Sequence, residues 1–168
     1  PQAPHAVVSG VSSGIGRAIA WRLLDDGWRV TGLCRSQPPD VHPRLAIVQA
    51  DVADHAALAP LCARIAADGV PVRALVHAAG FMRTAPLGAL DAAQGQAMWQ
   101  VHVQAAEALA NGLLPHMPDG ARIVLIGSRT ANGSPSRSQY AASKAALVGL
   151  ARSWAAELAP RGITVNVI

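Results

Sequence analysis

The chain has 168 residues, of which 51% are hydrophobic and 14% are charged, so it can bury one sizeable core. This composition excludes a disordered chain, and no apolar run approaches the roughly 20 residues that a membrane-spanning helix needs. Residues 1–8 lack the charged and apolar regions of a signal peptide. We therefore expect one domain over residues 1–168 that is soluble, cytoplasmic and not bound to a membrane.

The charge distribution indicates which ligands the surface favours, and the cysteine spacing indicates the state of the thiols. The net charge is +4 at pH 7, and the basic residues are scattered along the chain without a cluster. A scattered basic surface without a stacking aromatic set argues against nucleic-acid binding, although it favours anionic small molecules. Cys34 and Cys62 show no paired spacing, which predicts reduced packing thiols rather than a disulfide or a metal site.

Short apolar stretches alternate along the chain with longer Ala-rich stretches of helical period, as in βαβ units of a parallel sheet. The expected strands are 6–9, 29–33, 45–49, 74–77, 122–126 and 163–168. The expected helices are 15–25, 54–68, 91–113 and 139–158, and residues 36–43 are expected to form a crossover loop. The predicted fold class is α/β, a Rossmann-type doubly wound parallel sheet in a single three-layer αβα domain.

A glycine-rich turn follows the first expected strand and opens an amphipathic helix. Glycine permits a tight turn, lets the main chain approach a pyrophosphate, and lets the helix pack against the strand. The helix N-terminus then offers unpaired N–H groups and a positive dipole to phosphates. A ligand-free turn is the alternative interpretation. The residues assigned here to dinucleotide binding are Gly10, Ser12, Ser13, Gly14, Ile15 and Gly16.

The second expected strand is followed by Arg35, and no acidic residue stands at its end. In dinucleotide-binding domains an acid at this place binds the 2′-hydroxyl of NAD, whereas an arginine accommodates the 2′-phosphate of NADP. Arg35 therefore predicts NADP(H) as the cofactor, with NAD(H) less favoured. A solvated surface arginine is the alternative.

Tyr140 and Lys144 are one turn apart on an expected helix and so share a face. A tyrosine ordinarily titrates near pH ~10, and an adjacent ammonium favours phenolate and brings proton transfer toward neutral pH. Such a pair alone is commonly a solvent-facing pair. Here Tyr140 is the single tyrosine, and Ser128 follows the end of the fifth expected strand, on the edge where open α/β sheets bind ligands. Other serines in the following loop are Ser134, Ser136 and Ser138.

These motifs together resemble the short-chain dehydrogenase/reductase family over essentially the whole chain, with functional analogy to 3-oxoacyl-carrier-protein reductases. The resemblance rests on the spacing G-x-x-x-G-x-G, the pair Y-x-x-x-K and the strand-end serine. It implies reversible hydride transfer between NADP(H) and a ketone or secondary alcohol. It also implies that Tyr140 is the acid and base, that Lys144 assists it and holds the nicotinamide ribose, and that Ser128 fixes the substrate oxygen.

The resemblance assigns five further residues to the cofactor. Asp51 and Val52 follow the third expected strand, where the family meets the adenine ring. Ala78, Ala79 and Gly80 follow the fourth expected strand, where the family places small residues beside a ribose.

The chain departs from the family pattern at several places, among them Gly127, which replaces a serine that often precedes the strand-end serine. Ser9 replaces a threonine in the glycine motif, and Ser128 precedes Tyr140 by 12 residues, one fewer than the commonest spacing. His77 replaces an asparagine after the fourth strand, where we expect a core or loop histidine bonded to the backbone. His102 replaces an asparagine that serves the family's proton relay, and is expected to act in that relay or to be a packed histidine.

The partners implied are a small-molecule carbonyl or alcohol substrate and further copies of the chain, as a homodimer or homotetramer. No metal is expected. A non-catalytic NADP-binding regulator or partner-binding subunit is the alternative function. Family members place a substrate loop and a last strand beyond the segment that ends at Ile168, so we expect those parts to be missing and the sequence does not predict the substrate.

Overall fold

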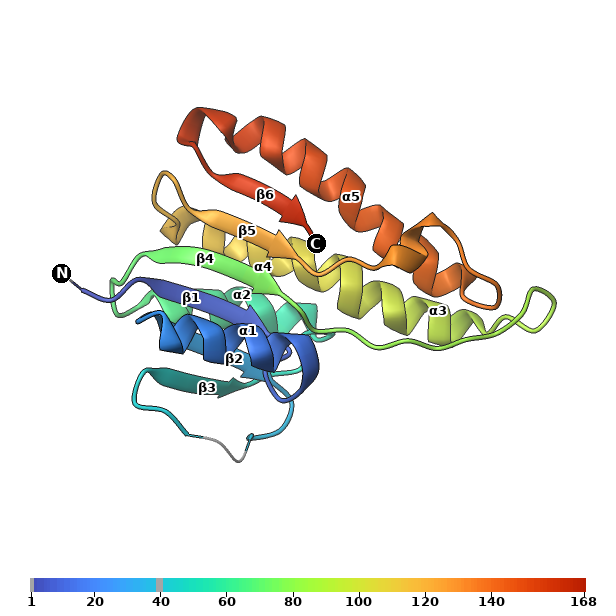
Figure 1. The fold of residues 1–168 in the computed structure, drawn as a ribbon, viewed down its shortest axis with the longest axis horizontal. Helices are drawn as coiled ribbons and strands as arrows, with labels where there is room; N and C mark the ends of the chain where they lie inside the picture. The colour runs from blue at the N-terminus through green and yellow to red at the C-terminus, as the bar shows by residue number, and fades with distance from the viewer. Residues whose placement is uncertain (1, 39–40) are drawn as a thin grey trace.

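The computed structural model describes residues 2–38 and 41–168, so residues 39–40 of the expected 36–43 loop lie outside the described residues. Six strands form one sheet in the order β3-β2-β1-β4-β5-β6, and every neighbouring pair is parallel (Figure 1). The strands are β1 (His5–Ser9), β2 (Arg29–Cys34), β3 (Leu45–Gln49), β4 (Val72–His77), β5 (Arg122–Leu125) and β6 (Thr164–Val167).

Helices cover both faces of this sheet. The α-helices are α1 (Gly14–Asp25), α2 (His55–Ala66), α3 (Ala92–Trp99), α4 (Ala105–Leu113) and α5 (Ser138–Leu158). A π-helical turn, η1 (Gln100–Gln104), joins α3 to α4. Short 3₁₀ turns are η2 (Leu114–His116), η3 (Arg129–Asn132) and η4 (Ala159–Arg161).

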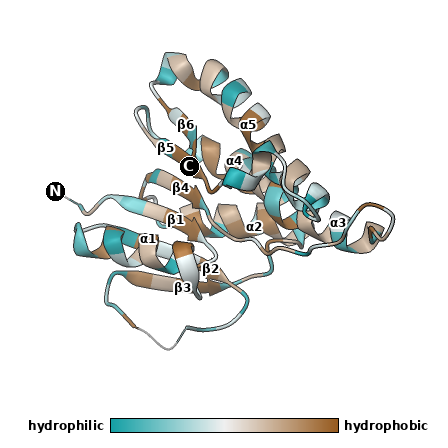
Figure 2. Cartoon of the chain, turned by 45° about the vertical axis from the view of Figure 1, so that its right-hand side comes forward, coloured by the Kyte–Doolittle hydropathy of each residue, from teal (hydrophilic) through white to brown (hydrophobic). Residues whose placement is uncertain are grey.

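The core has two parts because successive strand residues point to opposite faces of the sheet. In β1, Val7 packs with residues of α2, α4 and α5, whereas Ala6 and Val8 pack with Ala20 and Leu24 of α1. Figure 2 shows hydrophobic residues concentrated along the strands and hydrophilic residues spread over the outer helix surfaces. The predicted three-layer αβα domain with a parallel sheet is therefore confirmed.

The predicted elements are confirmed with their ends shifted by at most two residues, with one exception. The helix expected over 91–113 is not a regular α-helix, because η1 interrupts it. There the amide of Ala105 donates to Gln100 O, five residues back, and the side chain of His77 donates to Val101 O. Hydrophobic periodicity does not detect such a turn, since bonds from a distant side chain help to fix it.

The described residues contain no helix that is long and apolar enough to cross a membrane. Within residues 2–38 and 41–168, no three His, Cys, Asp or Glu side chains gather as a metal site. Cys34 and Cys62 are both buried free thiols, and burial raises the pKa of both, that of Cys62 to about 11. They are therefore packing thiols of low reactivity.

The strand order places a crevice at the carboxyl edge of the sheet. The chain leaves β1 for α1 on one face and leaves the adjacent β4 for α3 and α4, of which α4 packs on the other face. Open α/β sheets bind ligands where the chain diverges in this way. The ends of β1, β2, β4 and β5 are thus the parts of the fold that position a site.

Gly16 packs directly on the main chain of the turn, and this contact generates a test of the fold. A Cβ at Gly16 would lie 2.3 Å from Gly10 O and 3.0 Å from Ser9 O. We expect Gly16→Ala to lower the unfolding free energy by about 1–3 kcal/mol, because α1 must shift to make room. Gly149→Ala on α5 is the matched control, since its Cβ meets nothing within 4 Å, and it should raise stability by roughly 0.5–1 kcal/mol. If both variants changed the unfolding free energy measured in urea by the same amount, the close packing of Gly16 on the turn would be contradicted.

Candidate active site

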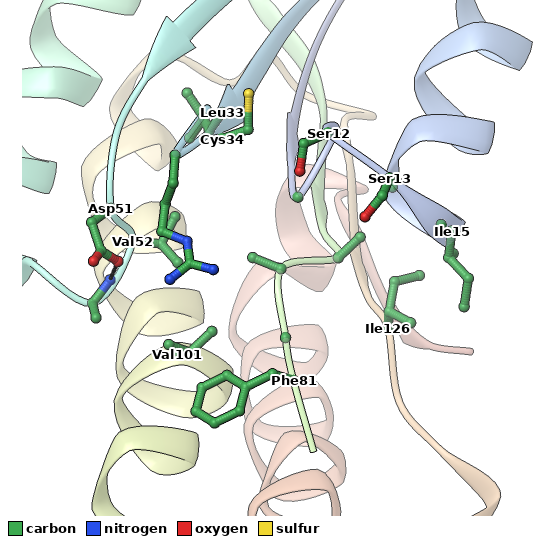
Figure 3. Close-up of a pocket in the computed structure, with 18 of the residues that line it drawn as sticks. Ser12, Ser13, Ile15, Leu33, Cys34, Asp51, Val52, Phe81, Val101 and Ile126 are labelled. Atoms are coloured by element: carbon green, nitrogen blue, oxygen red, sulfur yellow. Dashed lines mark hydrogen bonds between the residues drawn. The ribbon is translucent and has the colours of Figure 1, made fainter. Parts of the chain in front are cut away.

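A cleft of about 640 Å³ opens at the carboxyl edge of the sheet. Every residue that the sequence suggested for the cofactor lines it, so the structure brings these separate segments together. Figure 3 shows part of the lining, with Ser12, Ser13 and Ile15 on one side and Asp51 and Val52 on the other. The expected lining residues are Gly10, Ser12, Ser13, Gly14, Ile15, Gly16, Arg35, Asp51, Val52, Ala78, Ala79, Gly80, Tyr140 and Lys144.

The glycine turn forms one wall of the cleft. Gly10 has a φ of +78°, donates to Leu33 O at 2.8 Å, and lies so close to the main chain of Ala79 that a Cβ would be 2.8 Å from it. Ser13 is the N-cap of α1, and its side chain makes no capping hydrogen bond. The N–H groups of the first turn and this hydroxyl therefore remain suited to binding phosphate oxygens.

The opposite wall comes from the ends of β2 and β3. Arg35 is exposed, and within the described part of the chain no acidic side chain forms an ion pair with it. Its position is fixed through the main chain, because Gln49 Nε2 donates to Arg35 O at 2.7 Å. Asp51 accepts the amide of Ala53 at 2.9 Å, which shapes the turn that carries Val52 into the lining. Arg35 thus offers an unneutralised guanidinium to the cleft.

Ser9 and His77 form a buried network that holds the base of the cleft. Ser9 Oγ accepts the amides of Ala78 and Ala79, both at 3.1 Å, so its own proton is directed to His77 Nδ1 at 2.8 Å. His77 Nε2 then donates to Val101 O at 2.9 Å. Burial, followed by the charge of Lys144, lowers the pKa of His77 to about 4. His77 is therefore a neutral core histidine bonded to the backbone.

His102 lies in η1 and is fully buried behind the cleft rather than in its lining. Its Nε2 accepts the amide of Phe81 at 3.2 Å, and its Nδ1 lies 2.8 Å from Ser143 Oγ. Ser143 Oγ in turn donates to Tyr140 O at 2.8 Å. Burial, then the charge of Lys144, lowers the pKa of His102 to about 3. The ring is therefore neutral, with its proton on Nδ1.

The side chain of Lys144 places an ammonium group in the wall of the cleft. Only 6% of the residue is exposed, and its ammonium donates to Ile126 O at 2.7 Å. Burial lowers the pKa of Lys144 to about 8, because water is withdrawn from the charged form. Nζ lies 5.9 Å from the ring centroid of Tyr140, and both residues line the cleft from one face of α5. The other N–H groups of the ammonium can bind ligand hydroxyls.

Ser128 is not brought into this cleft. Its side chain caps η3, with Oγ 2.7 Å from Thr130 Oγ1 and accepting the amide of Thr130 at 3.2 Å. Gly127, one residue earlier, does line the cleft, whereas Ser128 borders a separate hollow beside Ile168. The conformation of the shortened 129–138 loop sets this arrangement, and the sequence alone does not predict it.

Sequence reasoning did not select Ser9 or Ser143 for a role in the site. Ser143 is 1% exposed and lies three residues after Tyr140, so a polar residue on the inward face of an amphipathic helix was the available signal. The available signal at Ser9 was that it replaces the threonine of the family's glycine motif. The bonds that they make depend on strand pairing and helix packing, which sequence spacing does not define.

The two neutral histidines predict an acid-sensitive fold. The pKa values of His77 and His102 lie below the ordinary value of 6.5, so the unfolded chain binds more protons than the folded chain as the pH falls below 6.5. Unfolding free energy should fall by about 1.4 kcal/mol per pH unit for each histidine between roughly pH 6 and pH 4.

Urea unfolding at a series of pH values measures this slope. His102→Asn cannot titrate in this range and should remove one histidine's share of the slope. His116→Asn is the matched control, because His116 is exposed, and it should leave the slope unchanged. The same slope in His102→Asn and the unsubstituted protein would show that His102 is not held neutral.

Comparison with known proteins places this geometry in a family. The short chain dehydrogenase family profile matches residues 4–168. The chain is 32% identical to the 3-oxoacyl-[acyl-carrier-protein] reductase FabG of Escherichia coli, over 97% of this chain and 70% of that protein. A short-chain dehydrogenase/reductase structure from Serratia marcescens matches with a TM-score of 0.89 at 34% identity, over 99% of this chain and 77% of that one.

A further solved structure bears on the cofactor. A short-chain dehydrogenase from Burkholderia cenocepacia in complex with NADP matches with a TM-score of 0.87 at 35% identity, over 99% of this chain and 73% of that one. The close glycine packing, the Ser13 hydroxyl that makes no capping bond at the start of α1, and the buried ammonium fit a nicotinamide dinucleotide. This chain therefore belongs to the short-chain dehydrogenase/reductase family of nicotinamide-dependent oxidoreductases.

Proposed function

We propose that this protein is an NADP(H)-dependent carbonyl reductase, or alcohol dehydrogenase in the reverse direction, acting on a ketone or secondary alcohol. The observation that carries the proposal is the placement of Tyr140 and Lys144 in the same cleft as the glycine turn and Arg35. A bound nicotinamide supplies the hydride in reduction and accepts it in oxidation.

The residues of the chain would divide the remaining work. Tyr140 donates a proton to the carbonyl oxygen during reduction and removes it during oxidation. The ammonium of Lys144 stabilises the negative charge that develops on the Tyr140 oxygen, and its free N–H groups hold ribose hydroxyls. Ser128 would fix the substrate oxygen only after exchanging its bond to Thr130 for one to the substrate.

The lining supports an apolar substrate. The cleft that Tyr140 lines is also lined by Phe81, Met82, Ala97 and Ile126, which suit the alkyl or acyl groups of a carbonyl compound. The relationship to a 3-oxoacyl-[acyl-carrier-protein] reductase supports 3-oxoacyl esters and thioesters as the first compounds to assay. A dimer or tetramer of this chain remains part of the proposal.

Substitution of Tyr140 tests its assignment as the proton donor. Tyr140→Phe should lower turnover of a 3-oxoester with NADPH by about 10²–10⁴-fold, because it deletes the proton donor. NADPH affinity should stay within about twofold, since the glycine turn, Arg35 and Lys144 are unchanged. A loss of activity below about tenfold would reject Tyr140 as the acid. Unsubstituted protein that binds NADPH and turns over no carbonyl compound would instead favour a non-catalytic NADP-binding regulator.

Substitution of Arg35 tests the preference for NADP(H) over NAD(H). A guanidinium pairs with a phosphate through charge-assisted bonds worth about 1.5–3 kcal/mol, so NADPH should bind about 10- to 100-fold more tightly than NADH. Arg35→Asp should reverse this preference, because a carboxylate repels the 2′-phosphate and accepts from the 2′-hydroxyl. Arg64→Asp, at an exposed arginine on α2 outside the cleft, is the control and should not change it. Equal dissociation constants of NADPH and NADH in the unsubstituted protein would contradict the assignment of Arg35 to the 2′-phosphate.

A further inference from the structure

Both ring nitrogens of His102 have one fixed partner. An amide N–H faces Nε2, so Nε2 must present its lone pair and the single ring proton must sit on Nδ1. Nδ1–H then donates to Ser143 Oγ, whose own proton is directed to Tyr140 O. The chain of bonds therefore runs in one direction, from the Phe81 amide through His102 and Ser143 to the main chain of Tyr140.

This arrangement disfavours a proton relay through His102. No hydrogen bond joins His102 to Lys144 in the described residues: both ring nitrogens of His102 are bonded elsewhere, and the ammonium donates to Ile126 O. The two groups face each other across Gly80, where a Cβ would lie 3.0 Å from His102 Nε2 and 3.7 Å from Lys144 Nζ. A protonated ring would place a second cation near this ammonium and turn an N–H toward the Phe81 amide.

The same contacts hold Tyr140 in place from two sides. The ring of His102 packs edge-on against the ring of Tyr140, with centroids 5.5 Å apart and planes at 88°. Ser143 fixes the main chain of Tyr140 in the first turn of α5. At its other end the network holds the Phe81 amide, in the segment that follows the cleft-lining residues 78–80. Among the described residues, no other side-chain hydrogen bond links segment 78–81 to α5.

We propose that His102 and Ser143 are positioning residues, which lock Tyr140 to the segment 78–81 so that its hydroxyl meets the substrate carbonyl beside the cofactor. This inference rests on the proposed carbonyl reductase function and gives His102 a task other than the relay. The π-helical turn is part of the device, because it carries His102 on the inner side of the helix with no exposed surface.

Kinetics of paired variants test the proposal with a 3-oxoester and NADPH. Ser143→Ala and His102→Leu should each lower kcat by about tenfold, because a small misplacement of a catalytic group has large effects on rate. The KM and the NADPH dissociation constant should change by less than about twofold. The double variant should be little slower than either single variant, since both changes break one chain of bonds. His102→Asn, whose amide can donate to Ser143 as Nδ1–H does, should restore most of kcat.

The pH–rate profile separates positioning from relay. In a positioning role no group of the network titrates in the working range, so the remaining activity of Ser143→Ala should keep the midpoints of the unsubstituted enzyme. Lys144, His77 and Tyr140 are the titratable groups that face His102, and none is altered. Ser153→Ala, at an exposed serine of the same helix, is the matched control and should keep full kcat. Shifted midpoints, or full kcat with a lowered melting temperature alone, would overturn the proposal.

A measurement without substrate keeps the inference testable if the proposed activity fails. In protein with ¹⁵N-labelled histidine, the His102 resonances, assigned by their loss in His102→Asn, should report a neutral ring protonated on Nδ1 throughout roughly pH 5–8. Ser143→Ala should shift the Nδ1 resonance, because its acceptor is removed. A ring protonated on Nε2, or one that titrates within this range, would overturn the bonding on which the proposal depends.

Discussion

The buried ammonium of Lys144 is the constraint on which the site depends. It is withdrawn from water and anchored to Ile126 O, and burial lowers its pKa to about 8. A cation in such a place limits what can surround it, because a second charge of the same sign would be costly. Its neighbours accordingly include Gly80, which has no side chain, and two histidines that remain neutral. The ammonium is thereby the one charged group beside Tyr140 for which the described structure shows burial in the cleft wall, as the proposed function requires.

The neutral histidines also connect the elements that surround the cleft. His77 connects the end of β1, through Ser9, to the carbonyl of Val101 in η1, and His102 connects η1 to α5. The ends of β1 and β4 are thus joined to η1 and α5 by directional bonds that buried side chains make. Such networks are strong when complete and costly when one member is lost. On the proposed function, stability and the placement of Tyr140 therefore depend on the same side chains.

Much of this architecture was predictable because it follows from patterns of residues that are close together in the sequence. Alternating strand and helix periods gave the sheet and its helices, and the glycine turn identified the edge that carries the cofactor cleft. The fixed register of a parallel sheet then brings Arg35, Asp51 and residues 78–80 to that edge. The network could not be predicted in the same way. The π-helical turn depends on the bond from the distant His77 to Val101 O, and the bond from His102 to Ser143 joins segments that are far apart in the sequence. The bonds from Ser143 to Tyr140 O and between Ser128 and Thr130 are local, but they depend on side-chain conformations that residue spacing does not define.

The central claim is that this cleft transfers a hydride from NADPH to a carbonyl carbon while the chain delivers a proton to the oxygen. Transfer of an isotopic label tests it most directly. The purified protein is incubated with a 3-oxoester and NADPH that carries deuterium at both hydrogen positions of C4 of the nicotinamide, and the alcohol product is analysed by mass spectrometry. We expect one deuterium on the carbinol carbon and none on the hydroxyl after exchange with water. Alcohol formed without deuterium at that carbon, or no alcohol from any 3-oxoester while NADPH is bound, would contradict it.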